Sequence, residues 1–289
     1  MNILIGLDIG GTKIMAAAAN EGGEILRRLR ADTPLDLQEG LSLLKKLAAR
    51  LRENNRIIAI GAAIGGPLEH NSGVVSPLHQ PQWRSVPLKN IMETQFRCHF
   101  VVDVDTNVAA LGEYKFGKET ASRLLYLTLS TGMGGGFLID GKIYRGAGGV
   151  HQEAGHQSIH FCCARPERVQ CECGARDCLE ALVSGNGIRR IYGKPAEKLT
   201  EEEWEEVGYN LGQGLRNLAT LYAPEVIVLG GGVAVGAGEK LLRPARATLH
   251  AHLKIVPAPQ VRLSRLGYDS ALIGAIALAM EGGSEGAGV

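Results

Sequence analysis

The sequence predicts an α/β protein built from two similar lobes. Two stretches show the same order of elements: a strand, a glycine-rich turn, a second strand, a tight turn and a third strand. The first stretch lies within residues 2–29 and the second within residues 123–145. Helical patterns follow each stretch, so a mixed sheet with covering helices is expected in each lobe. The repetition indicates a duplicated core with a cleft between the lobes.

The composition is that of a soluble globular protein. The 289 residues are enough for two lobes, and 45% of them are hydrophobic and 21% charged. Lys and Arg (31) nearly balance Asp and Glu (30), so no basic field predicts a nucleic-acid partner. No apolar run reaches the roughly 18 residues of a membrane span, and the first strand runs into Asp8 rather than a signal peptide. We therefore expect a cytoplasmic protein with no nucleic-acid or membrane partner.

The chain opens on a strand hairpin with a glycine-rich turn. Gly10 and Gly11 allow the backbone to approach a bulky ligand and leave amide groups to bind anions. Thr12 and Lys13 add a hydroxyl group and a cation that suit phosphate. A plain hairpin would explain the glycines equally well. Three strands are expected here: Asn2–Leu7, Ile14–Ala19 and Glu24–Leu29.

The rest of the first lobe alternates helix and strand. Apolar residues at spacings of three and four predict a helix over 35–55, and a buried strand follows over 57–64. Gly65-Gly66-Pro67 ends that strand. Residues 68–87 read as a long loop, of the kind that often faces a ligand, and a short helix follows up to Phe96.

Asp105 lies at a strand-to-helix junction. Val101, Val102 and Val104 predict a short buried strand, and Asp105-Thr106-Asn107 supplies the turn and N-cap residues of a helix that begins at Val108. A carboxylate at this junction can face a ligand site. The alternative is that Asp105 only caps the helix.

The second lobe repeats the hairpin with the glycine turn Ser130–Gly136. Helices are expected over 181–192 and from the capping box at Thr200 to Tyr222, and a last helix over 269–280. Neither GxxxxGK[ST] nor a GxGxxG that opens a helix is present. The two hairpins therefore predict phosphate binding as in actin-like ATPases and sugar kinases. Gly230-Gly-Gly232 follows a buried strand and would pass close to a nucleotide, with a dinucleotide crevice as the alternative.

Three cysteines lie within eight residues. Cys171, Cys173 and Cys178 offer soft thiolate ligands, and Zn²⁺ prefers four tetrahedral sulfur or nitrogen ligands. The spacing predicts a metal site in a reducing compartment rather than a disulfide framework. The alternative is three free buried cysteines. Cys98, isolated from them, is expected to be a small buried residue.

Seven stretches, in order, resemble one family, the ROK family (repressor, open reading frame, kinase). The resemblance covers almost the whole chain and implies a two-lobed actin-like ATPase fold, which is ribonuclease H-like. The stretches are Asp8-Ile-Gly-Gly-Thr-Lys13, Asp105-x-Asn107-x-Ala-Ala-Leu-Gly-Glu113, Ser130-Thr-Gly-Met-Gly-Gly-Gly136, Glu153-Ala-Gly-His156, Cys171-x-Cys-Gly-x-x-x-Cys-x-Glu180, Val226-Ile-Val-Leu-Gly-Gly-Gly-Val233 and Ser270-Ala-Leu-Ile-Gly-Ala275.

ROK members are mostly ATP-dependent kinases of hexoses or N-acylhexosamines, and some are sugar-responsive repressors with an N-terminal helix-turn-helix domain. The first strand here is expected from residue 2, which favours the kinase. The resemblance implies a homodimer. It also implies a small lobe of residues 1–113 and 269–289, and a large lobe of residues 114–268 with a zinc-binding insertion at 156–178.

The resemblance assigns roles to residues of this sequence. Asp105 would be the general base, a role typically worth ~10²–10⁴ in rate. Asp8 would help to hold Mg²⁺ through water. Sugar-binding residues would be Gly66, Glu153, His156 and Glu180. Residues for ATP and its phosphates would be Asp8, Gly10, Gly11, Thr12, Lys13, Thr131, Gly132, Gly134, Gly231 and Gly232.

The same resemblance makes His156 the fourth ligand of a structural Zn²⁺. Here, however, His156 precedes Cys171 by 15 residues, whereas the gap in the family is nearer ten. His160, Cys162 or Cys163 could therefore replace or supplement it.

Two departures concern the choice of sugar. The family usually has Asn before the catalytic Asp, and this chain has Val104. The family's loop Asn is also missing, and the loop carries His79 and Gln80 instead. Loss of a polar contact to a hydroxyl costs around 1–3 kcal/mol. Either His79 or Gln80 compensates, or the substrate is another sugar, such as fructose, allose or an N-acylhexosamine. A non-catalytic sugar-sensing protein is the alternative function, and a DNA-binding repressor the least expected one.

Overall fold

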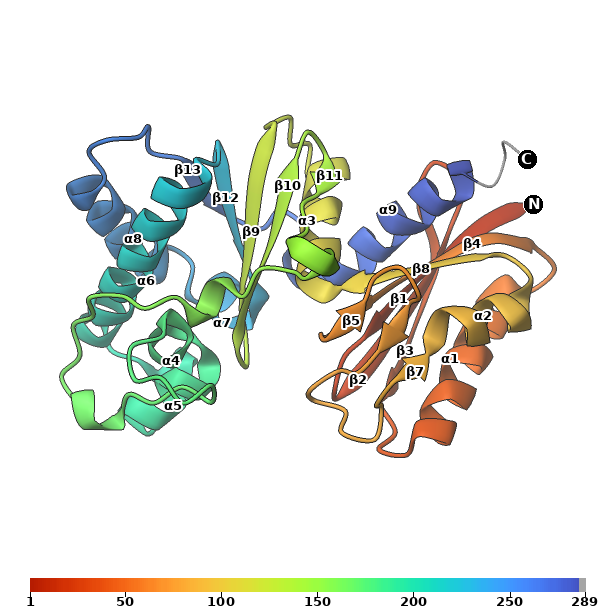
Figure 1. The fold of residues 1–289 in the computed structure, drawn as a ribbon, viewed down its shortest axis with the longest axis horizontal. Coiled ribbons are helices and arrows are strands. Elements are labelled where there is room, and N and C mark those ends of the chain that lie inside the picture. The colour runs from red at the N-terminus through yellow and green to blue at the C-terminus, as the bar shows by residue number, and fades with distance from the viewer. Residues whose placement is uncertain (286–289) are drawn as a thin grey trace. The chain divides into compact units, whose positions relative to one another are not determined.

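The computed structural model describes residues 1–285 (Figure 1). The chain forms two compact units. The first comprises Met1–Glu119, Arg145–His151 and the described part of Asp269–Val289. The second comprises Thr120–Tyr144 and Gln152–Tyr268. Each unit has its own hydrophobic core.

The first unit contains a five-stranded mixed sheet in the order β3-β2-β1-β4-β8. The hairpin strands β1, β2 and β3 are antiparallel, while β4 and β8 run parallel to β1. Its strands are β1 (Asn2–Ile9), β2 (Lys13–Ala19), β3 (Ile25–Asp32), β4 (Arg56–Ile64) and β8 (His99–Val104).

The second unit contains a sheet of the same plan, in the order β11-β10-β9-β12-β13. Again three antiparallel hairpin strands come first, and two strands parallel to the first follow. The prediction of an α/β fold with a duplicated mixed sheet is confirmed. The strands are β9 (Arg123–Leu129), β10 (Met133–Ile139), β11 (Lys142–Ile143), β12 (Val226–Gly230) and β13 (Gln260–Leu263).

The helices of the first unit are α1 (Leu37–Arg52), α2 (Leu88–Phe96), α3 (Asp105–Lys115) and α9 (Ser270–Glu285). The apolar stripe of α1 packs on the sheet, as its spacing predicts. The expected loop 68–87 contains a small antiparallel sheet that sequence periodicity did not reveal. Its strands are too short to show alternation: β5 (Leu68–Glu69), β6 (Val74–Val75) and β7 (Val86–Pro87).

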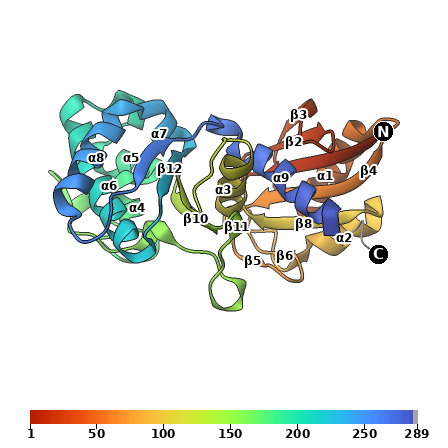
Figure 2. The ribbon, with the colours of Figure 1, turned by 90° about the horizontal axis from the view of Figure 1, so that it is seen from above.

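The second unit is richer in helices, most of which lie to the left of β12 in Figure 2. Thr200 and Glu203 form the predicted capping box, and the helix they open continues without a break to Tyr222. Helices α7 and α8 were not predicted from the sequence, because α7 is glycine-rich and α8 contains Pro244. The helices are α4 (Leu179–Val183), α5 (Gly185–Tyr192), α6 (Glu201–Tyr222), α7 (Gly231–Ala237) and α8 (Glu239–His252).

None of the helices within residues 1–285 combines the length and the hydrophobicity that a membrane span requires.

Two helices of the first unit, α3 and α9, cross with their backbones in close contact. A methyl group added at Gly274 of α9 would lie 1.9 Å from the carbonyl oxygen of Val108. One added at Gly112 of α3 would lie 2.8 Å from the backbone nitrogen of Gly274. Only glycine fits at such a crossing. Since Asp105 lies in the first turn of α3, this contact also fixes the position of that carboxylate.

We expect Gly274→Ala to lower the free energy of unfolding by about 3 kcal/mol, because the obstructing atoms belong to the backbone and the helices must move apart. Thermal or urea unfolding measures the effect. Gly236→Ala is the matched control, since a methyl group there meets nothing within 4 Å and alanine favours the helix. Equal stability of the two variants would contradict the prediction.

Candidate active site

Three parallel strands of the first unit end side by side. Ile9 of β1 pairs with Ile64 of β4, and Ile64 pairs with Val104 of β8. Residues that directly follow these strands therefore share one edge of the sheet: Gly10, Gly65 and Asp105. Ligands of open α/β sheets bind at the carboxyl ends of the strands. This edge is the candidate site of the first unit.

The turn after β1 is held in a defined shape. The amide of Gly10 donates to the carbonyl of Lys13 at 3.0 Å, and the hydroxyl of Thr33 donates to the carbonyl of Gly10 at 2.7 Å. Gly11, Thr12 and Lys13 are exposed. A ligand can therefore reach the part of the turn that the sequence assigned to phosphate.

Asp8, the next-to-last residue of β1, lies among other carboxylates. Burial, and then the charges of Asp105 and Asp269, raise the pKa of Asp8 to about 7, and Lys13 partly offsets this. Unfavourable burial of negative charge is the situation that a bound cation relieves.

We expect Asp8→Asn to change the pH dependence of stability. The pKa of Asp8 in the folded protein, about 7, exceeds its ordinary value of 3.8, so between these values the folded state binds more protons than the unfolded state. Stability of the unsubstituted protein therefore falls as pH rises through this window. The melting temperature of Asp8→Asn minus that of the unsubstituted protein should therefore be greater at about pH 8 than at about pH 5, in metal-free buffer. A difference in melting temperature that does not vary with pH would contradict the assignment.

Asp105 is itself part of α3. The helix begins at Asp105 with Val104 as N-cap, three residues earlier than predicted. The carboxylate of Asp105 accepts from the amide of Thr106 at 2.7 Å, so it lies at the helix N-terminus, where the dipole favours negative charge. It is half-buried, whereas the residues that follow are buried. The side chain therefore remains at the surface of the sheet edge.

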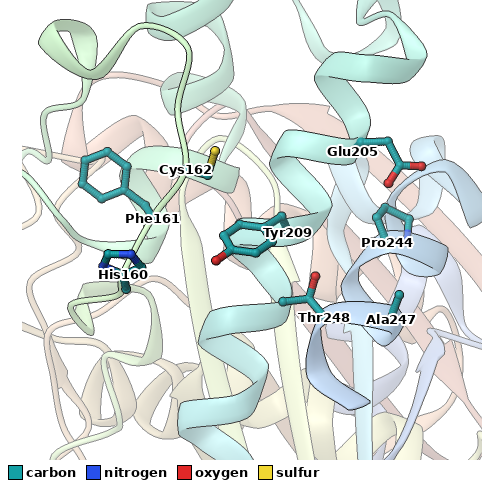
Figure 3. A pocket seen from close by; sticks show the side chains of 8 residues that line it. All are labelled: His160, Phe161, Cys162, Glu205, Tyr209, Pro244, Ala247 and Thr248. Atoms are coloured by element: carbon teal, nitrogen blue, oxygen red, sulfur yellow. The ribbon is translucent and has the colours of Figure 1, made fainter. Parts of the chain in front are cut away.

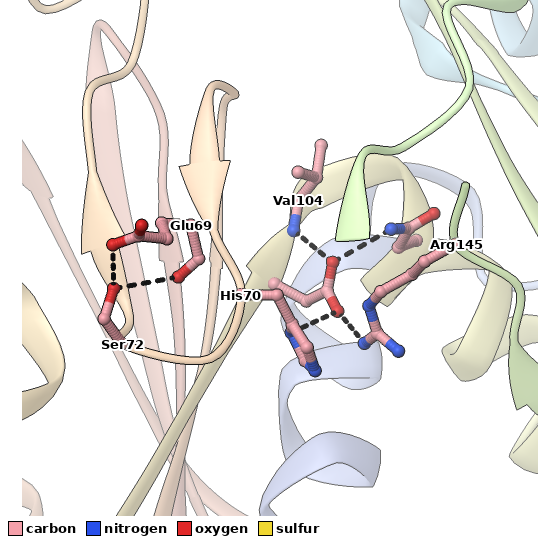
Figure 4. A network of polar contacts seen from close by, with 7 residues as sticks. Glu69, His70, Ser72, Val104 and Arg145 are labelled. Carbon is pink, nitrogen blue, oxygen red and sulfur yellow. Dashed lines mark hydrogen bonds and ion pairs between the residues drawn. The ribbon is translucent and has the colours of Figure 1, made fainter. Parts of the chain in front are cut away.

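A buried ionic network near the end of β8 was missed by sequence reasoning (Figure 4). Asp103, 1% exposed, forms an ion pair with Arg145, and its Oδ2 lies 3.6 Å from Nδ1 of His70. Its Oδ1 accepts from the amide of Val104 at 2.7 Å and from the side chain of Asn107 at 2.9 Å. Burial and the nearby Arg145 lower the pKa of His70, which keeps the imidazole neutral. No sequence spacing connects Asp103 to Arg145, which lies in a distant loop.

His79 and Gln80, the loop residues expected to replace the missing Asn, contact other parts of the first unit. A methyl group at Gly11 would lie 3.2 Å from Cβ of His79, so His79 packs on the turn after β1. Gln80 is buried, and its carbonyl accepts from the amide of Trp83. Val104 is 5% exposed and apolar. The side chain of Val104, the last residue of β8, therefore makes no polar contact in place of the missing Asn.

The glycine turn of the second unit is braced by the start of α5. The amide of Gly185 donates to the carbonyl of Ser130 at 2.7 Å, and that of Asn186 donates to the carbonyl of Thr131 at 3.0 Å. Gly132 lies close to Glu180, since an added methyl group would lie 2.9 Å from its Oε2. The turn therefore has a fixed geometry, in which the carbonyl groups of Ser130 and Thr131 point toward the start of α5.

Beside this turn lies a cavity of about 420 Å³. Thr131 and Gly232, both predicted as nucleotide contacts, line it. Gly231 does not. Its φ is +83°, and a methyl group there would lie 2.3 Å from the carbonyl oxygen of Leu129, so it allows a tight turn at the end of β12. Polar residues that sequence reasoning missed also line the cavity: Asn186, Arg189, Glu197 and Lys240.

Four side chains of the second unit form a compact Cys/His cluster. Ligand atoms of His156, Cys171, Cys173 and Cys178 all lie within 4.8 Å of one another. The Sγ of Cys171 is 3.4 Å from Nδ1 of His156, and the Sγ atoms of Cys173 and Cys178 are 3.5 Å apart. Tetrahedral Zn–S bonds of about 2.3 Å place two sulfurs roughly 3.7 Å apart. The cluster therefore fits a Zn²⁺ ion.

The environment of the cluster favours the thiolate form of Cys173 even before a metal binds. Hydrogen bonds, first from the amide of Ala175 and then from Cys178, lower the pKa of Cys173 to about 7. Burial raises the pKa of Cys171 and of Cys178. Buried thiols that resist ionisation on their own become ligands when a metal supplies the charge.

The predicted sugar residues of the second unit lie next to this cluster. Residues 154–156 form a 3₁₀ turn in which the amide of His156 donates to the carbonyl of Glu153 at 3.0 Å. Glu153 is exposed. The Oε2 of Glu180 accepts from the amide of Met133 at 2.8 Å, and its Oε1 lies 3.7 Å from the Sγ of Cys171. Glu180 thus connects the glycine turn to the cluster.

The alternative metal ligands, His160, Cys162 and Cys163, are not part of this cluster. His160 and Cys162 line a separate hollow of about 680 Å³, together with Tyr209 of α6 and Thr248 of α8 (Figure 3). The backbone of Cys162 is fixed by Asn210, which accepts from its amide at 2.9 Å and donates to its carbonyl at 2.8 Å.

Comparison with known proteins decides the family. The sequence model of the ROK family matches residues 4–282 of this chain. The chain belongs to the ROK family. Two glucokinases are similar over nearly their full length. That of Halalkalibacterium halodurans is 30% identical, covering 93% of this chain and 92% of the relative. That of Streptomyces coelicolor is 31% identical, covering 97% and 98%.

Solved ROK structures confirm the actin-like ATPase fold. The ROK hexokinase of Thermus thermophilus superimposes with a TM-score of 0.85, at 31% identity, covering 96% of this chain and 98% of that one. A ROK glucokinase of Streptomyces griseus in complex with glucose and AMPPNP gives 0.79, at 30% identity, covering 97% and 100%. ROK proteins include regulators as well. The xylose repressor of Caldicellulosiruptor bescii is 27% identical, covering 95% of this chain and 77% of the relative.

Proposed function

We propose that this ROK protein is an ATP-dependent, glucokinase-like sugar kinase that phosphorylates a free hexose at its 6-hydroxyl. The observation that carries the proposal is the half-buried carboxylate of Asp105, which follows β8 at the same sheet edge as the turn after β1. Phosphoryl transfer needs positioning, charge neutralisation and a base for the attacking hydroxyl. Asp105 would accept the hydroxyl proton as the oxygen attacks the γ-phosphorus and ADP departs.

The nucleotide is assigned to the glycine turns and to the cavity beside Thr131 and Gly232. Amide groups of the two turns would bind the phosphates, and Lys240 and Arg189 add positive charge to the cavity. Mg²⁺, when bound with ATP, would neutralise phosphate charge, and Asp8 would hold it through water. The relative solved with glucose and AMPPNP supports this assignment.

The sugar is assigned to Glu153, His156, Glu180 and the backbone of Gly66, whose polar groups suit ring hydroxyls. His156 would have two functions. With Nδ1 directed at the sulfur of Cys171 and bound to Zn²⁺, Nε2 remains for a hydroxyl. Zn²⁺ itself would be structural and would fix the 156–178 segment.

A non-catalytic sugar sensor is the second candidate. The likeness to the xylose repressor and the presence of Val104 favour it. An intact Asp105 favours the kinase, because a sensor needs no base.

Coupled ADP release with Mg-ATP tests the proposal. Glucose, mannose, fructose, allose, N-acetylglucosamine and N-acetylmannosamine form the panel, and zinc-loaded protein is used. Turnover with one of them is expected. Sugar binding without turnover would favour the sensor instead.

A further inference from the structure

Residues 145–151 belong to the first unit, although the second unit precedes and follows them in sequence. The segment holds its own shape: the amide of Gly146 donates to the carbonyl of Val150 at 2.7 Å, and that of Gly149 donates to the carbonyl of Gly146 at 3.0 Å. It is a closed turn, with Arg145 at one end and His151 at the other.

This segment is attached to the first unit at three points. Arg145 forms the buried ion pair with Asp103 (Figure 4). Gly149 approaches His70, since a methyl group there would lie 3.5 Å from its Cβ. The imidazole of His151 lies against Gly66. The segment therefore rests on the end of β8 and on the turn after β4.

The third contact brings a polar ring to the candidate site. A methyl group added at Gly66 would lie 2.8 Å from Cε1 of His151, 3.5 Å from Nε2 and 3.7 Å from Nδ1. The edge of the ring that carries both nitrogens therefore faces Gly66. Because Ile64 pairs with Val104, Gly66 and Asp105 leave the sheet at the same edge. His151 is thus placed beside the junction that presents Asp105.

Val104, the last residue of β8, is apolar and buried and offers no side-chain donor or acceptor. The carboxylate of Asp103, one residue earlier, is already engaged by Arg145 and Asn107. An imidazole can donate and accept hydrogen bonds, and a ring hydroxyl of a sugar requires both. We propose that His151 hydrogen-bonds to a hydroxyl of the acceptor sugar and determines which sugar is accepted. Arg145 is the positioning residue that holds the segment in place through Asp103. The inference rests on the proposed sugar kinase function.

Sugar affinity measured without nucleotide tests the inference directly. Calorimetric titration of the zinc-loaded protein with each sugar of the panel gives the dissociation constants, and steady-state assays give kcat and KM. We expect His151→Ala to weaken binding of the preferred sugar by about tenfold and to change the order of preference among epimers. The value of kcat should change by less than about threefold, since the phosphoryl-transfer groups remain. His151→Gln, which keeps a donor and an acceptor, should restore part of the affinity.

Val150→Ala is the matched control, since Val150 is exposed and lies in the same turn. A second test is independent of His151→Ala. Gly66→Ala inserts a methyl group 2.8 Å from the ring and should weaken sugar binding less when His151 is already Ala. Unchanged affinities and preferences in His151→Ala, with an active unsubstituted enzyme, would overturn the inference and leave the kinase intact. If sugar binding depended on His151 but no sugar were turned over, the proposed kinase function would be overturned and the contact between His151 and the sugar would stand.

Discussion

Asp105→Asn is expected to lower kcat by at least about a hundredfold. The amide has nearly the same shape as the carboxylate, and its oxygen can still accept from the amide of Thr106, which the carboxylate does at 2.7 Å. What is lost is the ability to accept the proton of the attacking hydroxyl. The dissociation constant for the sugar should therefore change little, and the loss should appear almost entirely in kcat. Coupled ADP release and sugar titration on the same preparation measure both quantities.

Asp36→Asn is the control for this substitution. Asp36 caps α1 by accepting from the amide of Glu39 at 3.0 Å, and asparagine caps equally well. It should leave kcat and the melting temperature near those of the unsubstituted protein. If Asp105→Asn kept more than about a tenth of the activity while folded, Asp105 would not be the base.

The sequence predicts this fold well because its signals are local. Each hairpin is marked by short apolar runs on both sides of a glycine turn, and the capping box at Thr200 and Glu203 marks the start of α6. The two missed helices, α7 and α8, carry glycines and Pro244, whose propensities oppose helix, and burial of their apolar faces overrides them. The three short strands of residues 68–87 fall below the length at which alternation can be read.

The candidate site was predictable to the extent that its residues lie in contiguous motifs. Asp8, Asp105 and the cysteines stand in such motifs, whereas Arg145 meets Asp103 and His151 meets Gly66 only through the tertiary fold. The polar residues that line the cavity beside Thr131 come from three segments for the same reason: α5, the 3₁₀ turn at 196–198 and α8. Their partners could not be chosen from spacing, since any arginine or histidine of a loop would have fitted equally well.

Loss of the proposed zinc ion is expected to have the largest effect on stability. Cys178→Ser removes a buried ligand and leaves Cys171 and Cys173 with an incomplete site, so the metal should be lost. We expect less than about a tenth of the zinc content of the unsubstituted protein and a loss of about 3–5 kcal/mol in the free energy of unfolding. For a domain of about 150–250 residues this is a fall of roughly 6–20 °C in melting temperature. Metal analysis and calorimetry measure the two effects.

The contacts of the cluster also predict how the loss of zinc should change sugar affinity. His156 belongs to the cluster, with its Nδ1 3.4 Å from the Sγ of Cys171. Oε1 of Glu180 lies 3.7 Å from the same sulfur, and its Oε2 accepts from the amide of Met133 in the glycine turn. Sugar affinity should therefore fall with the zinc content, whether zinc is removed by a chelator or by Cys178→Ser. Cys162→Ser changes an exposed thiol outside the cluster and should alter neither quantity. Zinc content in Cys178→Ser equal to that in Cys162→Ser would mean that these four residues do not hold the metal.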